Sequence, residues 1–178
     1  STSNKEATYD MTKYLIDKGH EEIAFIMTSK DDTVLERERL SGYEQALNES
    51  NIKLDESLIK YGGTTYEAGY ESMKELLEEG IVPQATFVTG DEAAIGAINA
   101  ACDKGYKVPE DISVAGFNDV KIAKMYRPKL TTVYQPLYDM GAVAIRMVIK
   151  LINKEHLESK KIELPYKIIE RESVISRK

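Results

Sequence analysis

The chain has 178 residues, of which 42% are hydrophobic and 30% are charged, a composition that suits one ordinary globular domain or two small ones. Its formal net charge of −6 argues against direct binding of nucleic acid by these residues, because contacts to phosphate need clustered lysine and arginine. No run of residues approaches the roughly 20 apolar residues of a membrane span, and the amino-terminal residues lack the pattern of a signal peptide.

Hydrophobic periodicity predicts helices that alternate with short strands over the first two thirds of the chain. Apolar residues at helical spacing indicate helices at 4–18, 35–51, 66–79 and 91–104. Short apolar runs between them indicate strands at 23–27, 58–61, 85–88 and 112–117. Short strands and helices in this alternation form right-handed βαβ units. The sequence therefore predicts an α/β fold with a parallel sheet flanked by helices.

The pattern changes after the strand at 112–117. The expected elements are a polar loop at 118–127, a strand at 130–134, a helix at 137–153, and β-rich segments at 162–164 and 167–170. Pro165 lies between the last two segments and suits an edge strand or a bend. This tail does not continue the simple βα repeat.

Residue patterns that indicate catalysis or metal binding are scarce. His20 and His156 are far apart and stand in polar contexts, so both are expected to be solvated surface residues. Cys102 is the single cysteine and lies on the inner stripe of its helix, so we expect a buried, inert thiol. A single cysteine also excludes an intrachain disulfide and favours a reducing compartment, the cytoplasm. We predict no enzyme, no metal site and no cofactor.

Polar residues follow the predicted strands. The loops in question are 28–34, 62–65, 89–91 and 118–119. All of them lie at the carboxyl edge of the sheet, which is where open α/β sheets bind small ligands. Their hydroxyls, carboxylates and amide suit a polyhydroxylated or otherwise polar molecule. The residues alone thus predict a small-molecule site at this edge.

Five stretches, in order along the whole chain, resemble the lactose-repressor/galactose-repressor family of bacterial transcription regulators. They are 18–26, 39–47, 87–96, 108–117 and 128–136. The resemblance implies the fold of periplasmic sugar-binding proteins, in which two α/β lobes hold an effector between them. It also implies an amino-terminal helix-turn-helix domain that reads operator DNA.

The same resemblance divides the chain into three parts. Residues 1–117 are expected to form the carboxyl-terminal lobe, and 118–161 a crossover with a strand and a helix of the amino-terminal lobe. Residues 162–178 are expected to return to the carboxyl-terminal lobe. The DNA-binding headpiece and most of the amino-terminal lobe are expected to be absent. The implied function is effector and corepressor sensing in a dimeric regulator of carbon metabolism.

The implied effector residues are Arg39, Asp91, Asn118 and Asp119, which should converge on one space at the sheet's carboxyl edge. The expected effector is a sugar or phosphosugar. Asn118 departs from the family, whose members usually carry an aspartate there. This difference leaves open a different ligand, or no small ligand at all.

Residues 138–146, followed by Lys150, resemble a subgroup of the family that governs carbon catabolite control. In that subgroup this helix receives a serine-phosphorylated phosphocarrier protein as corepressor. The matching positions are Tyr138, Arg146 and Lys150, whose cations can pair with a phosphate. The alternative is a structural helix in which these charged side chains only form the solvent-exposed edge. Its apolar stripe would then be the part that packs, and it consists of Met140, Val143, Met147 and Leu151. That stripe needs a partner, which in the family is the amino-terminal lobe. Unless that lobe is present, the helix should dock on another copy or fold back on its own lobe.

Ile95, Met125 and Tyr126 match interface positions of the family and are expected to form an apolar patch across a two-fold axis. Operator DNA would be contacted only through the missing headpiece.

Two other classes of protein remain possible from the sequence. One is a periplasmic-type sugar-binding protein of a transporter, which shares the fold. The other is a small α/β enzyme that uses Asp91 or Asp119.

Overall fold

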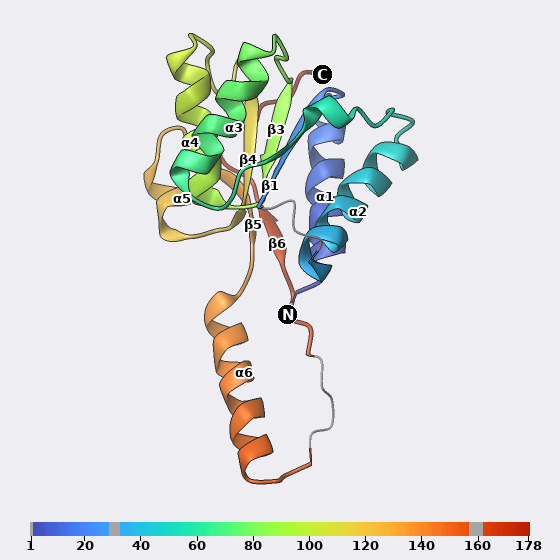
Figure 1. Cartoon of the computed structure of the whole chain (residues 1–178), viewed down its shortest axis with the longest axis vertical. Helices are drawn as coiled ribbons and strands as arrows, with labels where there is room; N and C mark the ends of the chain where they lie inside the picture. Colours follow the sequence, from blue (N-terminus) through green and yellow to red (C-terminus); the bar gives the residue numbers. More distant parts are fainter. Residues whose placement is uncertain (1, 29–32, 157–161) are drawn as a thin grey trace.

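The computed structural model describes residues 2–28, 33–156 and 162–178, and its centre is a sheet of six strands (Figure 1). The strands are β1 (Ile23–Met27), β2 (Ile59–Tyr61), β3 (Ala85–Val88), β4 (Ser113–Asn118), β5 (Thr131–Tyr134) and β6 (Lys167–Ile169). Their spatial order is β2-β1-β3-β4-β5-β6. Strands β1 to β5 run parallel, and β6 is an antiparallel edge strand. The predicted α/β fold with a mostly parallel sheet is confirmed.

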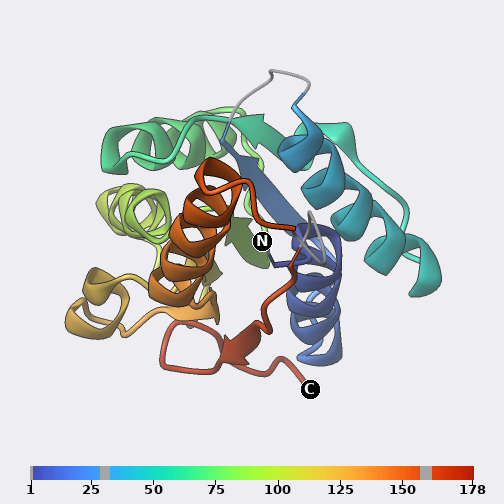
Figure 2. The same ribbon diagram turned by 90° about the horizontal axis from the view of Figure 1, so that it is seen from below.

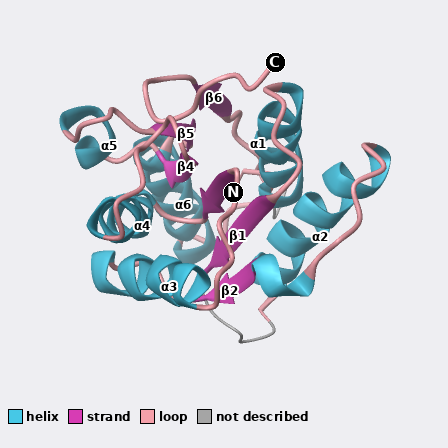
Figure 3. Cartoon of the chain, turned by 90° about the horizontal axis from the view of Figure 1, so that it is seen from above, coloured by secondary structure: helices cyan, strands magenta, loops and turns pink. Residues whose placement is uncertain are grey.

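Helices cover both faces of this sheet (Figure 3). They are α1 (Asn4–Asp17), α2 (Val34–Glu49), α3 (Tyr66–Glu78), α4 (Asp91–Asp103), α5 (Lys121–Met125) and α6 (Leu137–Ile152), with a short 3-10 turn, η1 (Glu56–Leu58). Helices α1 and α2 lie on one face, and α3 and α4 on the other. Because both faces are covered, every residue of β1 and β3 is buried, which explains the continuous apolar runs in the sequence.

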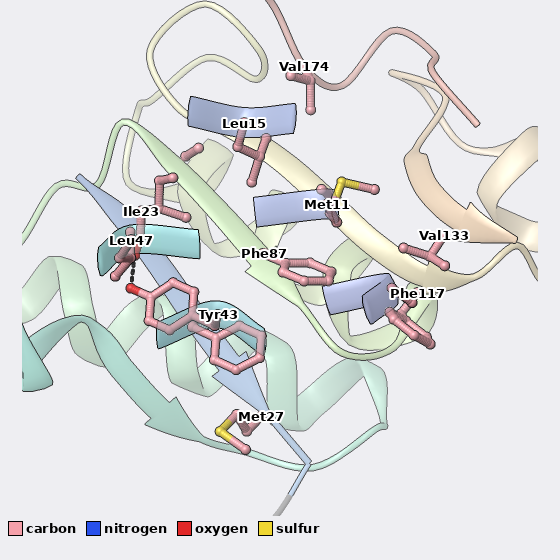
Figure 4. Close-up of a cluster of buried hydrophobic side chains, with 14 residues drawn as sticks. Met11, Leu15, Ile23, Met27, Tyr43, Leu47, Phe87, Phe117, Val133 and Val174 are labelled. Carbon is pink, nitrogen blue, oxygen red and sulfur yellow. Dashed lines mark hydrogen bonds between the residues drawn. The ribbon is translucent and has the colours of Figure 1, made fainter. Parts of the chain in front are cut away.

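Two hydrophobic cores result, one on each side of the sheet. Side chains alternate along a strand, so Phe87 and Phe117 point to the α1–α2 side, where Tyr43 also packs (Figure 4). The Tyr43 hydroxyl donates a hydrogen bond to the carbonyl of Ile23 at 2.8 Å, so its polar atom is satisfied inside the core. Val88 belongs to the core on the α3–α4 side.

Helices α3 and α4 approach each other closely through two glycines. A Cβ atom at Gly69 would collide with the carbonyl oxygen of Ala93, and one at Gly96 with the carbonyl oxygen of Tyr66. Each helix therefore supplies a glycine at the place where the other helix's backbone passes.

The tail corrects the predicted division of the chain. Strand β5 pairs in parallel with β4, with Gly116 opposite Thr132, so it belongs to this lobe's sheet. The assignment of this strand to another lobe is therefore wrong. The physical reason is burial: Val133 in the strand and Leu130 directly before it are fully buried, one in each core, so this segment completes both. Helix α5 also lies within the predicted polar loop, with Ala123 buried.

Helix α6 projects away from the lobe beyond the end of β5 (Figure 1), and it lies in front of the lobe when the chain is seen from below (Figure 2). None of its residues is buried, and Leu151 is 59% exposed. The helix therefore does not fold back on its own lobe, and that expectation is wrong. Its docking on another copy remains a prediction.

Three passes of the chain meet where α6 leaves the lobe. Gln135 follows β5, and its side-chain amide donates a hydrogen bond to the hydroxyl of Thr2 at the beginning of the described chain. The returning strand β6 places Lys167 opposite Tyr134. Only Lys167–Ile169 forms a strand in the return segment, and 162–164 does not. The expectation of an edge strand after Pro165 is confirmed.

Two predictions about single residues are wrong. His20 is fully buried, because the carboxyl-terminal segment covers it, and its Nε2 lies 3.0 Å from the carbonyl oxygen of Ile175. Burial lowers the pKa of the His20 imidazole. Cys102 is exposed, because the buried face of α4 passes through its neighbour Ala101. His156 is exposed, as expected.

Candidate functional site

A polar cluster lies at the carboxyl edge of β1 and β3. Thr28 directly follows β1 and Thr89 directly follows β3, and their hydroxyl oxygens are 3.2 Å apart. The two strands are parallel neighbours, so their ends meet at one edge. Arg39, from the second turn of α2, donates from Nη1 to the Thr28 hydroxyl at 3.3 Å. This is the position at which the sequence predicted a small-molecule site.

Arg39 is the centre of this cluster and is only 7% exposed. Its guanidinium carbon lies 4.9 Å from the ring centroid of Phe117, a distance that allows a cation–π interaction. Its Nη1 also lies 3.2 Å from Oε1 of Glu36, one turn earlier on the same helix. Burial lowers the pKa of Arg39, and the Glu36 carboxylate opposes that shift. We call Arg39, Glu36, Thr28 and Thr89 the Arg39 cluster.

The Arg39 cluster has unused hydrogen-bonding capacity. Nε of Arg39 and Oε2 of Glu36 are buried and have no hydrogen-bond partner among the described residues. Buried polar atoms without partners are uncommon and often mark a place where a ligand or water completes the site. Sequence reasoning found Arg39 but missed Glu36. The available signal was its spacing, since residues three apart on a helix are neighbours.

Asp91 does not join the Arg39 cluster, contrary to the prediction. Its Oδ2 accepts a hydrogen bond from the backbone N–H of Val120 at 2.7 Å, and its Oδ1 accepts from the Thr132 hydroxyl at 2.5 Å. A Cβ atom at Gly116 would collide with the Asp91 carboxylate. Gly116 and Phe117 face opposite sides of β4, so Asp91 and Arg39 lie on opposite faces of the sheet.

The environment of Asp91 changes its acidity. The residue is 2% exposed, and burial raises the pKa of its carboxyl group to about 7 against the bonds from Thr132 and Val120. Its carboxylate joins the first turn of α4 to the loop after β4 and to β5. This geometry is that of a structural link between three segments, which is a different role from the predicted effector contact.

Asp119 is also occupied by internal contacts. Its Oδ1 lies 2.6 Å from Nη2 of Arg171 in the return segment, and its Oδ2 lies 3.3 Å from Nζ of Lys124. Asn118 ends β4 with a φ of 108°, a left-handed backbone that asparagine tolerates better than most residues. The four predicted effector residues thus share the carboxyl edge but do not converge on one space.

The predicted dimer residues are also separated. Ile95 is 3% exposed and packs inside the lobe, so it cannot contribute to an exposed patch in this conformation. Met125 is 67% exposed, and Tyr126 is half-buried with its hydroxyl donating to Asn99 at 2.6 Å. Met125 and Tyr126 line a shallow hollow of about 450 Å³ together with Ile122. The exposed apolar surface around Met125 and Tyr126 therefore contains Ile122 and does not contain Ile95, which the sequence had predicted there.

The predicted corepressor residues lie on α6, beside the same edge. Because β5 is parallel to its neighbours, α6 leaves the lobe from the carboxyl edge, where the Arg39 cluster lies. Tyr138, Arg146 and Lys150 are exposed along this helix. The structure therefore leaves all three side chains accessible.

Within residues 2–28, 33–156 and 162–178, no group of three or more histidine, cysteine or acidic side chains could hold a metal ion. In the same described ranges, no helix is both long and apolar enough to span a membrane.

Comparison with known proteins gives a consistent result over almost the whole chain. A model of the periplasmic binding protein-like domain family matches residues 12–174. The chain is 41% identical over 169 residues to catabolite control protein A of Priestia megaterium, which covers 95% of this chain and 51% of that protein. The chain thus spans about half the length of the curated relatives it matches.

Solved structures show the same similarity. Transcription regulator CcpA of Lactococcus lactis superposes with a TM-score of 0.90 and 42% identity, covering 97% of this chain and 63% of that chain. A complex of transcriptional regulator CelR with cellobiose superposes with a TM-score of 0.90 and 33% identity, covering 97% and 52% of the two chains. With such coverage, the similarity includes α6 as well as the sheet.

Proposed function

Because the chain belongs to the periplasmic binding protein-like family, among transcription regulators of the lactose-repressor type, we propose that it senses the effector in a regulator of carbon catabolism. The observation that carries this proposal is the Arg39 cluster. A buried guanidinium, a carboxylate and two hydroxyls meet at the edge where such sheets bind small ligands. The relatives named above are regulators, so a transporter protein is not favoured, and we propose no enzymatic activity.

The proposed effector is a small sugar or phosphosugar. Hydroxyl, carboxylate and guanidinium groups offer both donors and acceptors to a hydroxylated molecule. The cellobiose complex of the similar regulator supports a sugar. Arg39 is proposed to contact the effector, and Asn118 to lie at the margin of the site. Asp91 and Asp119 are not included in this proposal, because their carboxylates are held by internal bonds.

The rest of the effector site would come from a second lobe. We propose that α1 to α5 and β1 to β6 form one lobe and that α6 packs in the other. Since α6 has no buried residue and is apolar over most of its surface, it needs such a partner. The chain's coverage of about half of each relative leaves room for that lobe and for a DNA-binding headpiece.

Two protein partners belong to the same proposal. A second copy of the chain would cover the exposed hollow that contains Met125 and Tyr126. A serine-phosphorylated phosphocarrier protein would bind Tyr138, Arg146 and Lys150 on α6. Operator DNA would be bound through the headpiece, in the cytoplasm.

The effector proposal is tested by operator binding of the full-length protein, measured by fluorescence anisotropy with a panel of sugars and phosphosugars. At least one of them should change operator affinity, and Arg39→Ala should abolish the response while sugar-free operator binding persists. Lys74→Ala is the control, since Lys74 lies on the outer surface of α3. A response that survives Arg39→Ala would contradict the proposal.

The corepressor is tested by titrating the full-length protein with phosphorylated and unphosphorylated phosphocarrier. Tighter binding of the phosphorylated form, weakened by Arg146→Ala, is expected. Equal affinity for the two forms would remove this partner without affecting the effector proposal.

A further inference from the structure

The Arg39 cluster has no net charge, because it contains one guanidinium and one carboxylate. The side chains of Arg39 and Glu36 are 8% and 7% exposed, and their charged groups are 3.2 Å apart. Thr28 and Thr89 are uncharged. The positive charge that would attract an anionic ligand is therefore already matched by a carboxylate within the site.

We propose that Glu36 determines the charge selectivity of this site, so that it accepts an uncharged polyhydroxylated ligand and rejects a phosphorylated or carboxylated one. This inference rests on the proposed function, because it concerns the ligand of the same site. It narrows that ligand from sugars and phosphosugars to neutral sugars or sugar alcohols.

The first argument is electrostatic. An anion that approaches Arg39 also approaches the Glu36 carboxylate, and both lie where water screens charge poorly. A buried cation that already has a counterion gains little from a second anion, while the two anions repel each other. A neutral ligand is not repelled by the Glu36 carboxylate.

The second argument concerns hydrogen bonds. Nε of Arg39 needs an acceptor, and Oε2 of Glu36 needs a donor. A sugar hydroxyl can accept from a guanidinium and donate to a carboxylate at the same time. An ionised phosphate oxygen can only accept, so it would leave Glu36 without a donor. The unsatisfied atoms of this cluster therefore suit hydroxyl groups.

Glu36 also differs from an ordinary acidic residue at a helix start. Thr33 caps α2 by accepting from the Glu36 N–H, and Thr65 caps α3 in the same way, with Glu67 in the first turn. Glu67 is exposed, whereas Glu36 is buried against Arg39. Offsetting the helix dipole does not require burial, so the position of Glu36 indicates a role beyond helix stability.

The test is the affinity of the full-length protein for inorganic phosphate, measured by isothermal titration calorimetry. Glu36→Gln keeps the shape of the side chain but leaves the Arg39 guanidinium without a counterion. Phosphate should then bind about tenfold more tightly or better than it binds the unmodified protein. The matched control is Glu71→Gln, which removes the carboxylate of an exposed pair with Lys74 at the same helical spacing. It should leave phosphate affinity unchanged.

An unmodified protein that binds phosphate as tightly as Glu36→Gln would overturn the inference. Loss of one partner of a buried pair can destabilise the fold, so a second measurement uses the unmodified protein and the double variant Arg39→Gln/Glu36→Gln. Thermal unfolding is compared in phosphate and in chloride of equal ionic strength. The two proteins should respond equally to phosphate, and a larger rise in midpoint for the unmodified protein would contradict the inference. Neither result depends on operator binding, which tests the proposed function separately.

Discussion

Asp91 illustrates how a residue expected at a ligand site serves the lobe instead. Its two oxygens accept from Thr132 and from the Val120 backbone, and its raised pKa of about 7 means that folding favours the protonated form. Between the ordinary pKa of 3.8 and the folded value, the native state binds more protons than the unfolded state. Stability contributed by this group is therefore present at low pH and is lost as the pH rises to about 7.

The variant Asp91→Asn should remove this pH dependence. Asparagine can still accept from Val120 and can donate to Thr132, but it does not ionise. Relative to the unmodified protein, its free energy of unfolding should gain up to about 1.4 kcal/mol per pH unit between about pH 4 and pH 7. Urea unfolding at a series of pH values measures the difference. Two parallel curves would show that Asp91 is not protonated in the native state over this range.

Among the helices, the contact between α3 and α4 depends on the absence of a side chain at Gly96. The change Gly96→Ala places a methyl group against the backbone of Tyr66, and we expect a loss of about 1–3 kcal/mol in the free energy of unfolding. Gly141→Ala is the matched control, because nothing lies within 4 Å of that position in α6. It should be neutral or stabilising by up to about 1 kcal/mol, since alanine favours a helix. Equal losses in the two variants would contradict the close-packing argument.

The apolar surface of α6 should be covered in the full-length protein, and a charge placed on it should then be destabilising. Met147→Asp should lower the free energy of unfolding by more than about 2 kcal/mol if that surface is covered by a second lobe. Asp139→Ala, on the polar flank of the same helix, is the control and should change it by less than about 0.5 kcal/mol. Chemical denaturation measures both. A Met147→Asp effect as small as the control would show that α6 is exposed in the complete protein.

At the scale of the whole molecule, the hollow beside α5 predicts self-association. Met125→Glu should weaken dimerisation of the full-length protein, because it places a charge in an apolar surface that the second copy would cover. Sedimentation velocity over a range of concentrations measures the dissociation constant, which we expect to rise by about tenfold or more. Val82→Glu, at an exposed apolar residue outside the hollow, should leave it unchanged. An unaltered dimer in Met125→Glu would place the interface elsewhere.

The sequence predicted the sheet and its large helices because burial on two faces produces strong local patterns, such as the uninterrupted apolar run of β1. It missed α5, which has only five residues and is too short to show a helical period. The candidate site was only partly predictable, since local patterns do not say which helix covers which face of β4. That arrangement separates Arg39 from Asp91. The burial of His20 was equally hidden, because it depends on Ile175, which is far away in the sequence.

The meeting of three chain passes at the start of α6 has a mechanical consequence. Thr2, Gln135 and Lys167 belong to separate passes, and all three passes are tied together by the Thr2–Gln135 bond and the β5–β6 ladder. Two of these passes, those of Gln135 and Lys167, connect the lobe covalently to α6, and two neighbouring backbone connections oppose rotation of α6 less than they oppose stretching. We therefore expect α6 to change its tilt relative to the lobe about this point. Because α6 is a helix of 16 residues, a small tilt at its first turn would move its last turn much further than its start.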